Sequence, residues 1–220
     1  MTGPVNPLTS AAREALRLYR STGADLPFGD PLTAHGVPTE GYRWRLTDPS
    51  SDRVLIARNV VNRGPTGPWA TLGLAASNGF LRTVLHPTAQ AAPGRLGAFA
   101  GTAFAGTSDR VVADLGRDAR LDASVRGPAP GSPRGSGVGS VFHTLPALDR
   151  RWHPWLLGGT ATGTAVVGED TWDLDGWTVY GEKTWGRGGL PDSWWSGQAH
   201  GFEDPAACVA FAGGEVRIGP

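Results

Sequence analysis

Residues 177–185 read WTVYGEKTW, and they decide the fold class because their side chains alternate in character with a period of two. One set of positions is polar and contains Thr178, Tyr180, Glu182 and Thr184. The other set is apolar or small except for a lysine, and contains Trp177, Val179, Gly181, Lys183 and Trp185. Successive side chains of a strand point to opposite faces, so the stretch predicts a β-strand with one polar face.

The stretch at 193–203 has the same alternation. Its first set contains Trp194, Ser196, Gln198, His200 and Phe202, and its second contains Trp195, Gly197, Ala199 and Gly201. Seven of the nine tryptophans lie between residues 152 and 195. We therefore expect the polar stripes to point into an aromatic-lined barrel, which is typical of a site for an apolar ligand with one polar end.

Outward from these strands, the chain consists mostly of short strand patterns and turns. Tyr42, Trp44 and Leu46 alternate with Arg43 and Arg45 before a turn at 48–52. Further strands are predicted at 54–57, 69–75, 80–85, 98–105, 110–114, 119–125, 139–145, 156–168, 171–185, 193–203 and 206–218. About a dozen strands without intervening helices predict an all-β antiparallel barrel or sandwich.

The N-terminal region, residues 1–40, differs from the β domain expected at 41–220. Its apolar residues predict a helix over 9–22, with Ser10 as its cap and Gly23 as its end. Residues 24–40 form a lead-in loop rich in proline and turn residues. Inside the β domain, the Gly/Pro/Ser-rich stretch 127–139 predicts a flexible loop without chemistry.

Composition excludes several classes of function. The formal net charge is zero, with 20 basic and 20 acidic residues, which argues against nucleic-acid binding and a polybasic membrane anchor. A single cysteine excludes an internal disulfide. Because neither a secretory signal nor an 18-residue apolar run is visible, we expect a cytoplasmic protein.

Common catalytic and cofactor motifs are absent from the sequence. There is no G-x-S-x-G, P-loop or dinucleotide fingerprint, and His143, His153 and His200 lack the spacing of a helical zinc site. We therefore expect neither a metal nor another cofactor. Taken alone, Glu182 beside Lys183 is more often a solvated charge pair than a catalytic acid, and clustered tryptophans are more often core than site.

The same residues nevertheless carry a resemblance. The run DLDGWTVYGEKTWG at 173–186, followed by Leu190-Pro191 and WWSGQ at 194–198, resembles the tocopherol cyclase family, whose hallmark is an E-K-N-W-G stretch followed by F-P, tryptophans and a glutamine. EGYRW at 40–44, which contains Trp44, is similar to that family's E-G-W-Y opening. Thr184, Ser196 and His200 depart from the pattern, so the substrate is expected to differ.

This resemblance implies a lipocalin-like (calycin) fold and an isomerase that closes a chromanol ring, adding the phenol oxygen of a prenylated quinol to an alkene of its tail. Glu182 would protonate the alkene, and aromatic faces would stabilise the resulting cation. Tyr180 and Gln198 would hold the phenol. Trp185, Trp194, His200 and Trp44 would line the substrate site.

Two other functions stay open at this point: a non-catalytic carrier of lipids or isoprenoids, and an alkene hydratase similar to the lipocalin-like carotenoid hydratases. In each case we expect a hydrophobic small-molecule ligand, no nucleic acid and at most peripheral membrane contact. Members of the resembled family are about twice as long, so we expect either a truncated chain or a single barrel that protects its edge strand, for example by homodimerisation.

The arginine-to-lysine ratio leads to one structural expectation. Nineteen of the 20 basic residues are arginines, and the single lysine, Lys183, lies within the EKTWG run. Arginine cannot replace a compact ammonium group in a tight site. We therefore expect Lys183 to have a structural role and to pair with a carboxylate on the face opposite Glu182.

Overall fold

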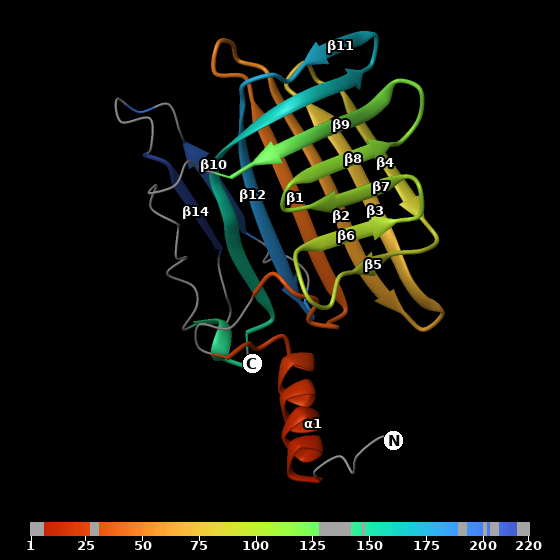
Figure 1. The fold of residues 1–220 in the computed structure, drawn as a ribbon, viewed down its shortest axis with the longest axis vertical. Coiled ribbons are helices and arrows are strands. Elements are labelled where there is room, and N and C mark those ends of the chain that lie inside the picture. The colour runs from red at the N-terminus through yellow and green to blue at the C-terminus, as the bar shows by residue number, and fades with distance from the viewer. Residues whose placement is uncertain are drawn as a thin grey trace, which may run out of the picture.

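The computed structural model describes residues 7–26, 31–127, 142–146, 148–188, 193–199, 202 and 207–214. These residues form one α-helix, a 12-stranded antiparallel sheet and a separate two-stranded sheet (Figure 1). The all-β antiparallel fold expected from the alternating sequence is thus confirmed. In this part of the chain no helix has the length and apolar character that crossing a membrane requires.

The elements are the helix α1 (Pro7–Ser21), the short 3-10 turn η2 (Phe142–Thr144) and the strands β1 (Thr39–Thr47), β2 (Val54–Gly64), β3 (Gly67–Ala76), β4 (Leu81–His86), β5 (Gln90–Ala91), β6 (Gly97–Ala100), β7 (Phe104–Thr107), β8 (Arg110–Asp114), β9 (Ala119–Arg126), β10 (Arg150–Val167), β11 (Asp170–Asp173), β12 (Trp177–Gly186), β13 (Trp194–Ala199) and β14 (Val209–Gly214).

The large sheet folds over on itself. Its strand order is β4-β3-β2-β1-β12-β10-β9-β8-β7-β6-β5, with β11 paired to the end of β10. Figure 1 shows β5–β9 crossing in front of β1–β4, so the sheet forms two layers joined through β12 and β10. Among the described residues β4 and β5 do not pair with each other, so the sheet is curled but open.

The core fills the space between the two layers. Tyr42, Trp44 and Leu46 of β1 are fully buried there, as their alternation with two arginines predicts. The ring of Trp44 packs against Phe104 at 5.8 Å and Trp155 at 6.1 Å between centroids. Its indole N–H donates to the carbonyl of Thr107 at 3.2 Å, which satisfies its one polar group.

Several predicted boundaries differ from the structure. The strand predicted at 171–185 is two strands, β11 and β12, separated by a turn at Gly176 with a φ of 77°. Likewise, the strand predicted at 98–105 is divided at Gly101. Residues 142–144 of the strand predicted at 139–145 form η2 instead, and the flexible loop predicted at 127–139 lies, after Gly127, outside the described residues.

The helix predicted over 9–22 is α1, which ends before Gly23 as expected but begins at Pro7, so Ser10 lies inside the helix and is not its cap. Gly23 has a φ of 90° and donates its N–H to the carbonyl of Arg20 at 2.8 Å. The chain then returns to the sheet, where the indole N–H of Trp185 donates to the carbonyl of Gly23 at 2.8 Å. Trp185 also stacks on His35, with 4.5 Å between ring centroids. The lead-in segment is therefore fixed to β12 by specific contacts.

Lys183 lies at the centre of these contacts, and its side chain is fully buried. Its Nζ lies 3.2 Å from Oε2 of Glu40, donates to the carbonyl of Thr33 at 2.6 Å and lies 3.0 Å from Nδ1 of His35. It also sits above the ring of Trp185, 5.2 Å from the centroid. The expected pairing of Lys183 with a carboxylate on the face opposite Glu182 is confirmed.

Glu40 is the buried counter-charge of Lys183. Burial alone would raise the pKa of Glu40, but the charge of Lys183 and the backbone N–H groups of His35 and Gly36 outweigh burial, so the pKa lies below its ordinary value of 4.5. Folding therefore favours the ionised carboxylate.

We expect Glu40→Gln to lower the free energy of unfolding by about 3–5 kcal/mol at neutral pH, because it leaves the ammonium of Lys183 buried without its counter-charge. The stabilisation from Glu40 is present above its ordinary pKa and is lost as the pH falls through the lower pKa of the folded state. The difference between parent and variant should therefore shrink as the pH falls below about 4.5. Urea unfolding at a series of pH values measures both effects.

The matched control is Asp122→Asn, which breaks the exposed pair between Arg110 and Asp122. It should change stability little, since surface ion pairs contribute little. An equal cost for the two variants would contradict the central role of the buried pair.

Candidate functional site

The outer face, defined as the side of the layer β4-β3-β2-β1-β12-β10 that is turned away from the core, carries the candidate site. Residues directly opposite one another in adjacent strands share a face, so the register gives three rows across it. The first row contains Leu81, Ala75, Ile56, Arg45, Tyr180 and Leu157. The second contains Thr83, Gly73, Arg58, Arg43, Glu182 and Pro154. The third contains Leu85, Thr71, Val60, Gly41, Thr184 and Trp152.

Glu182 is the polar centre of this face, and it is buried. Its Oε1 lies 2.9 Å from Nη2 of Arg43, its neighbour on β1. Its Oε2 accepts the hydroxyl of Tyr180 at 2.7 Å and the indole N–H of Trp152 at 2.8 Å. Three donors from three strands therefore converge on one carboxylate.

This arrangement fixes the direction of the hydrogen bonds. Burial, and then the charge and hydrogen bond of Glu182, raise the pKa of the Tyr180 hydroxyl, so the hydroxyl keeps its proton and donates it. Glu182 acts as an acceptor toward each of its three neighbours. The two oxygens of a carboxylate have about four acceptor sites, and these three neighbours occupy three of them.

Arginines surround Glu182 on its β1, β2 and β10 sides. Arg43 lies opposite Arg58, Arg45 lies opposite Tyr180, and Arg150 lies opposite Gly186 at the end of β12. The pKa values of Arg45, Arg58 and Arg150 are lowered, first by loss of hydration and then by the positive charge of a neighbouring guanidinium group. That neighbour is Arg43 for Arg45 and Arg58, and Arg58 for Arg150. Among the described residues, the pair between Arg43 and Glu182 is the one ion pair in this arginine cluster, which we define as Arg43, Arg45, Arg58 and Arg150.

Apolar side chains flank the cluster on both sides. Leu81 and Leu85 of β4 are 71% and 70% exposed, and Ile56 lies between β4 and Arg45 in the first row. On the β10 side, Pro154 and Leu157 lie opposite Glu182 and Tyr180. The outer face thus has a charged centre and apolar margins.

The structure separates the predicted site residues into two groups. Tyr180 and Glu182 meet on the outer face, whereas Trp185 and Trp44 are fully buried on the core side of the same strands. The expectation that the polar stripe of β12 points into the barrel is therefore wrong. Lys183 lies on the core side because Glu40 compensates its charge there, which leaves the Tyr180 side facing outward.

Two of the remaining predicted site residues, Trp194 and Gln198, belong to the second sheet. Trp194 and Gln198 are half-buried on β13, which pairs with β14; β14 in turn lies close to β10 (Figure 1). Both amide atoms of the Gln198 side chain are buried without a hydrogen-bond partner among the described residues. His200 lies outside the described residues. The binding roles of Trp194, Gln198 and His200 stay predictions.

Sequence reasoning missed Trp152 and the arginine cluster as parts of the site. Arg43 and Arg45 were visible as the polar half of an alternating strand, but nothing local indicated that β1 would pair with β12, more than 130 residues later. Only that register brings Arg43 against Glu182. The one sequence feature that could have indicated the cluster was the placement of Arg43 and Arg45 on the same side of one strand.

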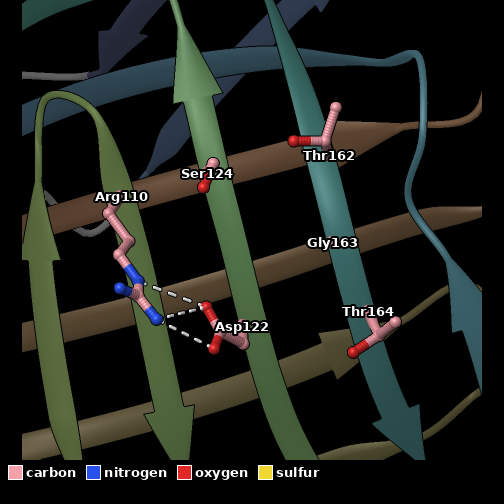
Figure 2. Close-up of a pocket in the computed structure, with 6 residues that line it drawn as sticks. All are labelled: Arg110, Asp122, Ser124, Thr162, Gly163 and Thr164. Atoms are coloured by element: carbon pink, nitrogen blue, oxygen red, sulfur yellow. Dashed lines mark hydrogen bonds and ion pairs between the residues drawn. The ribbon is translucent and has the colours of Figure 1, made fainter.

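A shallow hollow of about 380 Å³ lies elsewhere, on the outside of β8, β9 and β10 (Figure 2). Its lining residues are Arg110, Asp122, Ser124, Thr162, Gly163 and Thr164. Arg110 donates to both carboxylate oxygens of Asp122, at 2.9 and 3.0 Å, so the two charges satisfy each other (Figure 2). Because the one carboxylate in its lining is engaged by Arg110, the hollow offers no evident chemistry.

The described residues contain no group of three or more His, Cys, Asp or Glu side chains placed to hold a metal ion. Two histidines do meet: the rings of His143 and His153 lie 5.9 Å apart. However, Nε2 of His143 lies 3.1 Å from the carbonyl oxygen of Trp152, so this nitrogen contacts the backbone.

Comparison with known proteins supports the fold. A crystal structure at 2.00 Å resolution of a Nitrosomonas europaea protein with the provisional name AttH matches with a TM-score of 0.51 and 14% sequence identity. The match covers 86% of this chain and 69% of that one. The likeness agrees with the expected lipocalin-like, calycin-type fold, and at this identity it concerns the fold alone.

No family model and no curated protein matches the chain. The sequence comparisons therefore give no support to the resemblance to the tocopherol cyclase family.

We expect Tyr180 and Glu182 to be energetically coupled. Tyr180→Phe removes one hydrogen bond and should cost about 1 kcal/mol, whereas Glu182→Gln also breaks the pair with Arg43 and should cost about 2 kcal/mol. The double variant should cost less than the sum, because both changes remove the same hydrogen bond. Urea denaturation of all four proteins measures the coupling.

Thr178→Val combined with Glu182→Gln is the control. Thr178 lies on the same side of β12 but does not contact Glu182 through any described hydrogen bond, so these two costs should add. Strict additivity of the Tyr180 and Glu182 variants would contradict the coupled site.

Proposed function

We propose that this protein is a lipocalin-like binding protein for a small amphiphilic molecule, an isoprenoid or similar lipid with a polar head, which it holds on the outer face around Glu182. The observation that carries the proposal is the convergence of Tyr180, Trp152 and Arg43 on the Glu182 carboxylate, outside the core. Buried polar groups are costly unless they are paired, so the three neighbours hold the Glu182 carboxylate in a defined position for a ligand.

The surroundings of this network suit an amphiphile. The network offers oriented polar groups for a head, and the margins of the outer face offer apolar contacts for a tail at Leu81 and Leu85. Small-molecule sites typically combine apolar lining with a few placed polar groups. A lipocalin-like fold is compatible with this use, although the fold by itself does not determine function.

Geranylgeraniol is a suitable first probe, with an alcohol head and an isoprenoid tail. We expect Leu85→Ser to weaken binding by about tenfold, because it removes apolar contact with the tail. Leu18→Ser, which changes an exposed leucine of α1, is the matched control and should bind like the parent. Calorimetric titration measures both, and absence of binding by the parent protein would refute the proposal.

Cyclisation of a prenylated quinol, as in the tocopherol cyclases, is the second candidate. It is favoured by the hydrogen bond between Tyr180 and Glu182, which lies within the EKTWG run and joins a phenolic hydroxyl to a carboxylate at 2.7 Å. An acid must protonate the alkene before the phenol oxygen attacks the cation. Addition of water to the same cation would instead make the protein a hydratase.

We expect a geranylgeranyl quinol to bind without being converted, because the Glu182 carboxylate already forms an ion pair with Arg43 and accepts hydrogen bonds from Tyr180 and Trp152. Mass spectrometry after incubation distinguishes the functions. A new product of unchanged mass would establish cyclisation, and a gain of one water would establish hydration. Loss of either product in Glu182→Gln would identify Glu182 as the acid.

A further inference from the structure

We propose that the arginine cluster binds the anionic head group of this amphiphile, a phosphate, diphosphate or carboxylate attached to an apolar tail. The inference rests on the proposed function and specifies the chemical class of the ligand. It depends on three features of the outer face: an excess of positive charge, buried N–H groups without acceptors, and an apolar margin on one side.

The excess charge is local. Four guanidinium groups surround one carboxylate, although the whole chain has a formal net charge of zero. Arg43 and Arg58 are directly opposite in adjacent strands, where like charges destabilise a sheet. The chain thus concentrates more positive charge here than the one carboxylate of Glu182 compensates, and a bound anion would offset the remaining repulsion.

The unpaired donors point to the same ligand chemistry. Nε of Arg43, Nε of Arg45, and Nε and Nη1 of Arg150 are buried and have no hydrogen-bond partner among the described residues. A buried donor without an acceptor is costly, and it is more costly when charged. Phosphate and carboxylate oxygens are the acceptors that match the fork of a guanidinium group.

The apolar margin explains why the anion should carry a tail. From Arg45 the first row continues through Ile56 and Ala75 to the exposed Leu81. From Arg58 the second row continues over Gly73, which has no side chain to block the path. A head group at Arg43 and Arg58 would therefore place its tail across β3 toward Leu81 and Leu85.

The test compares ligands that share a tail and differ in charge. Geranylgeranyl diphosphate is paired with geranylgeraniol, oleate is paired with oleyl alcohol, and inorganic diphosphate supplies the head alone. We expect at least one anionic lipid to bind about tenfold or more tightly than its alcohol, with an affinity that falls as salt is raised. A difference between geranylgeranyl diphosphate and its alcohol would indicate a phosphate site, and a difference between oleate and its alcohol would indicate a carboxylate site.

Arg58→Met and Arg45→Met remove one charge each and keep an apolar stem of similar length. Each should weaken binding of the anionic lipid by about tenfold and leave binding of the alcohol unchanged. Arg110→Met, in the other layer, is the matched control and should bind like the parent. Circular dichroism shows which variants fold, and either arginine variant suffices for the comparison.

The outcomes separate the two proposals. Equal binding of lipid and alcohol would overturn the anionic head group while leaving a lipid-binding protein. Binding of inorganic diphosphate as tightly as its lipid would overturn the role of the tail. Binding of none of these ligands by the parent protein would overturn both proposals.

Discussion

The buried pair between Lys183 and Glu40, together with Trp177 and Val179 on the same side, sets the orientation of β12, and the rest of the structure depends on it. A charged ammonium group can be fully buried only where hydrogen-bond acceptors and a counter-charge surround it. Glu40, the carbonyl of Thr33 and the ring of His35 supply these on the core side. Because neighbours on a strand point in opposite directions, Glu182 then has to lie on the outer face.

The same contacts connect the N-terminal region to the sheet. Thr33 and His35 belong to the lead-in segment, and Trp185 binds the carbonyl that follows α1. The residues on one side of β12 thus pack in the core and contact the lead-in segment, while Tyr180 and Glu182 lie on its other side. Stability and the candidate binding face are carried by alternate residues of a single strand.

The sequence was sufficient to predict most of the strands and the composition of each face, because period-two alternation is a local property. It could not tell which face of β12 is buried, since a lysine among apolar residues does not reveal a distant partner such as Glu40. The site was predicted only in part for the same reason. Tyr180 and Glu182 are two residues apart, but Arg43 and Trp152 reach Glu182, and Arg58 reaches Arg43, through pairings across the sheet.

The burial of Lys183 also determines how the folded protein reacts with amine-directed chemistry. As the single lysine of the chain, with no exposed surface, it leaves the folded surface of the described residues without a lysine amine. Acylating reagents, and enzymes that acetylate or ubiquitinate lysine, can reach this side chain only when β12 and the lead-in separate. The one lysine is thus a built-in reporter of local opening at the contact between the N-terminal region and the sheet.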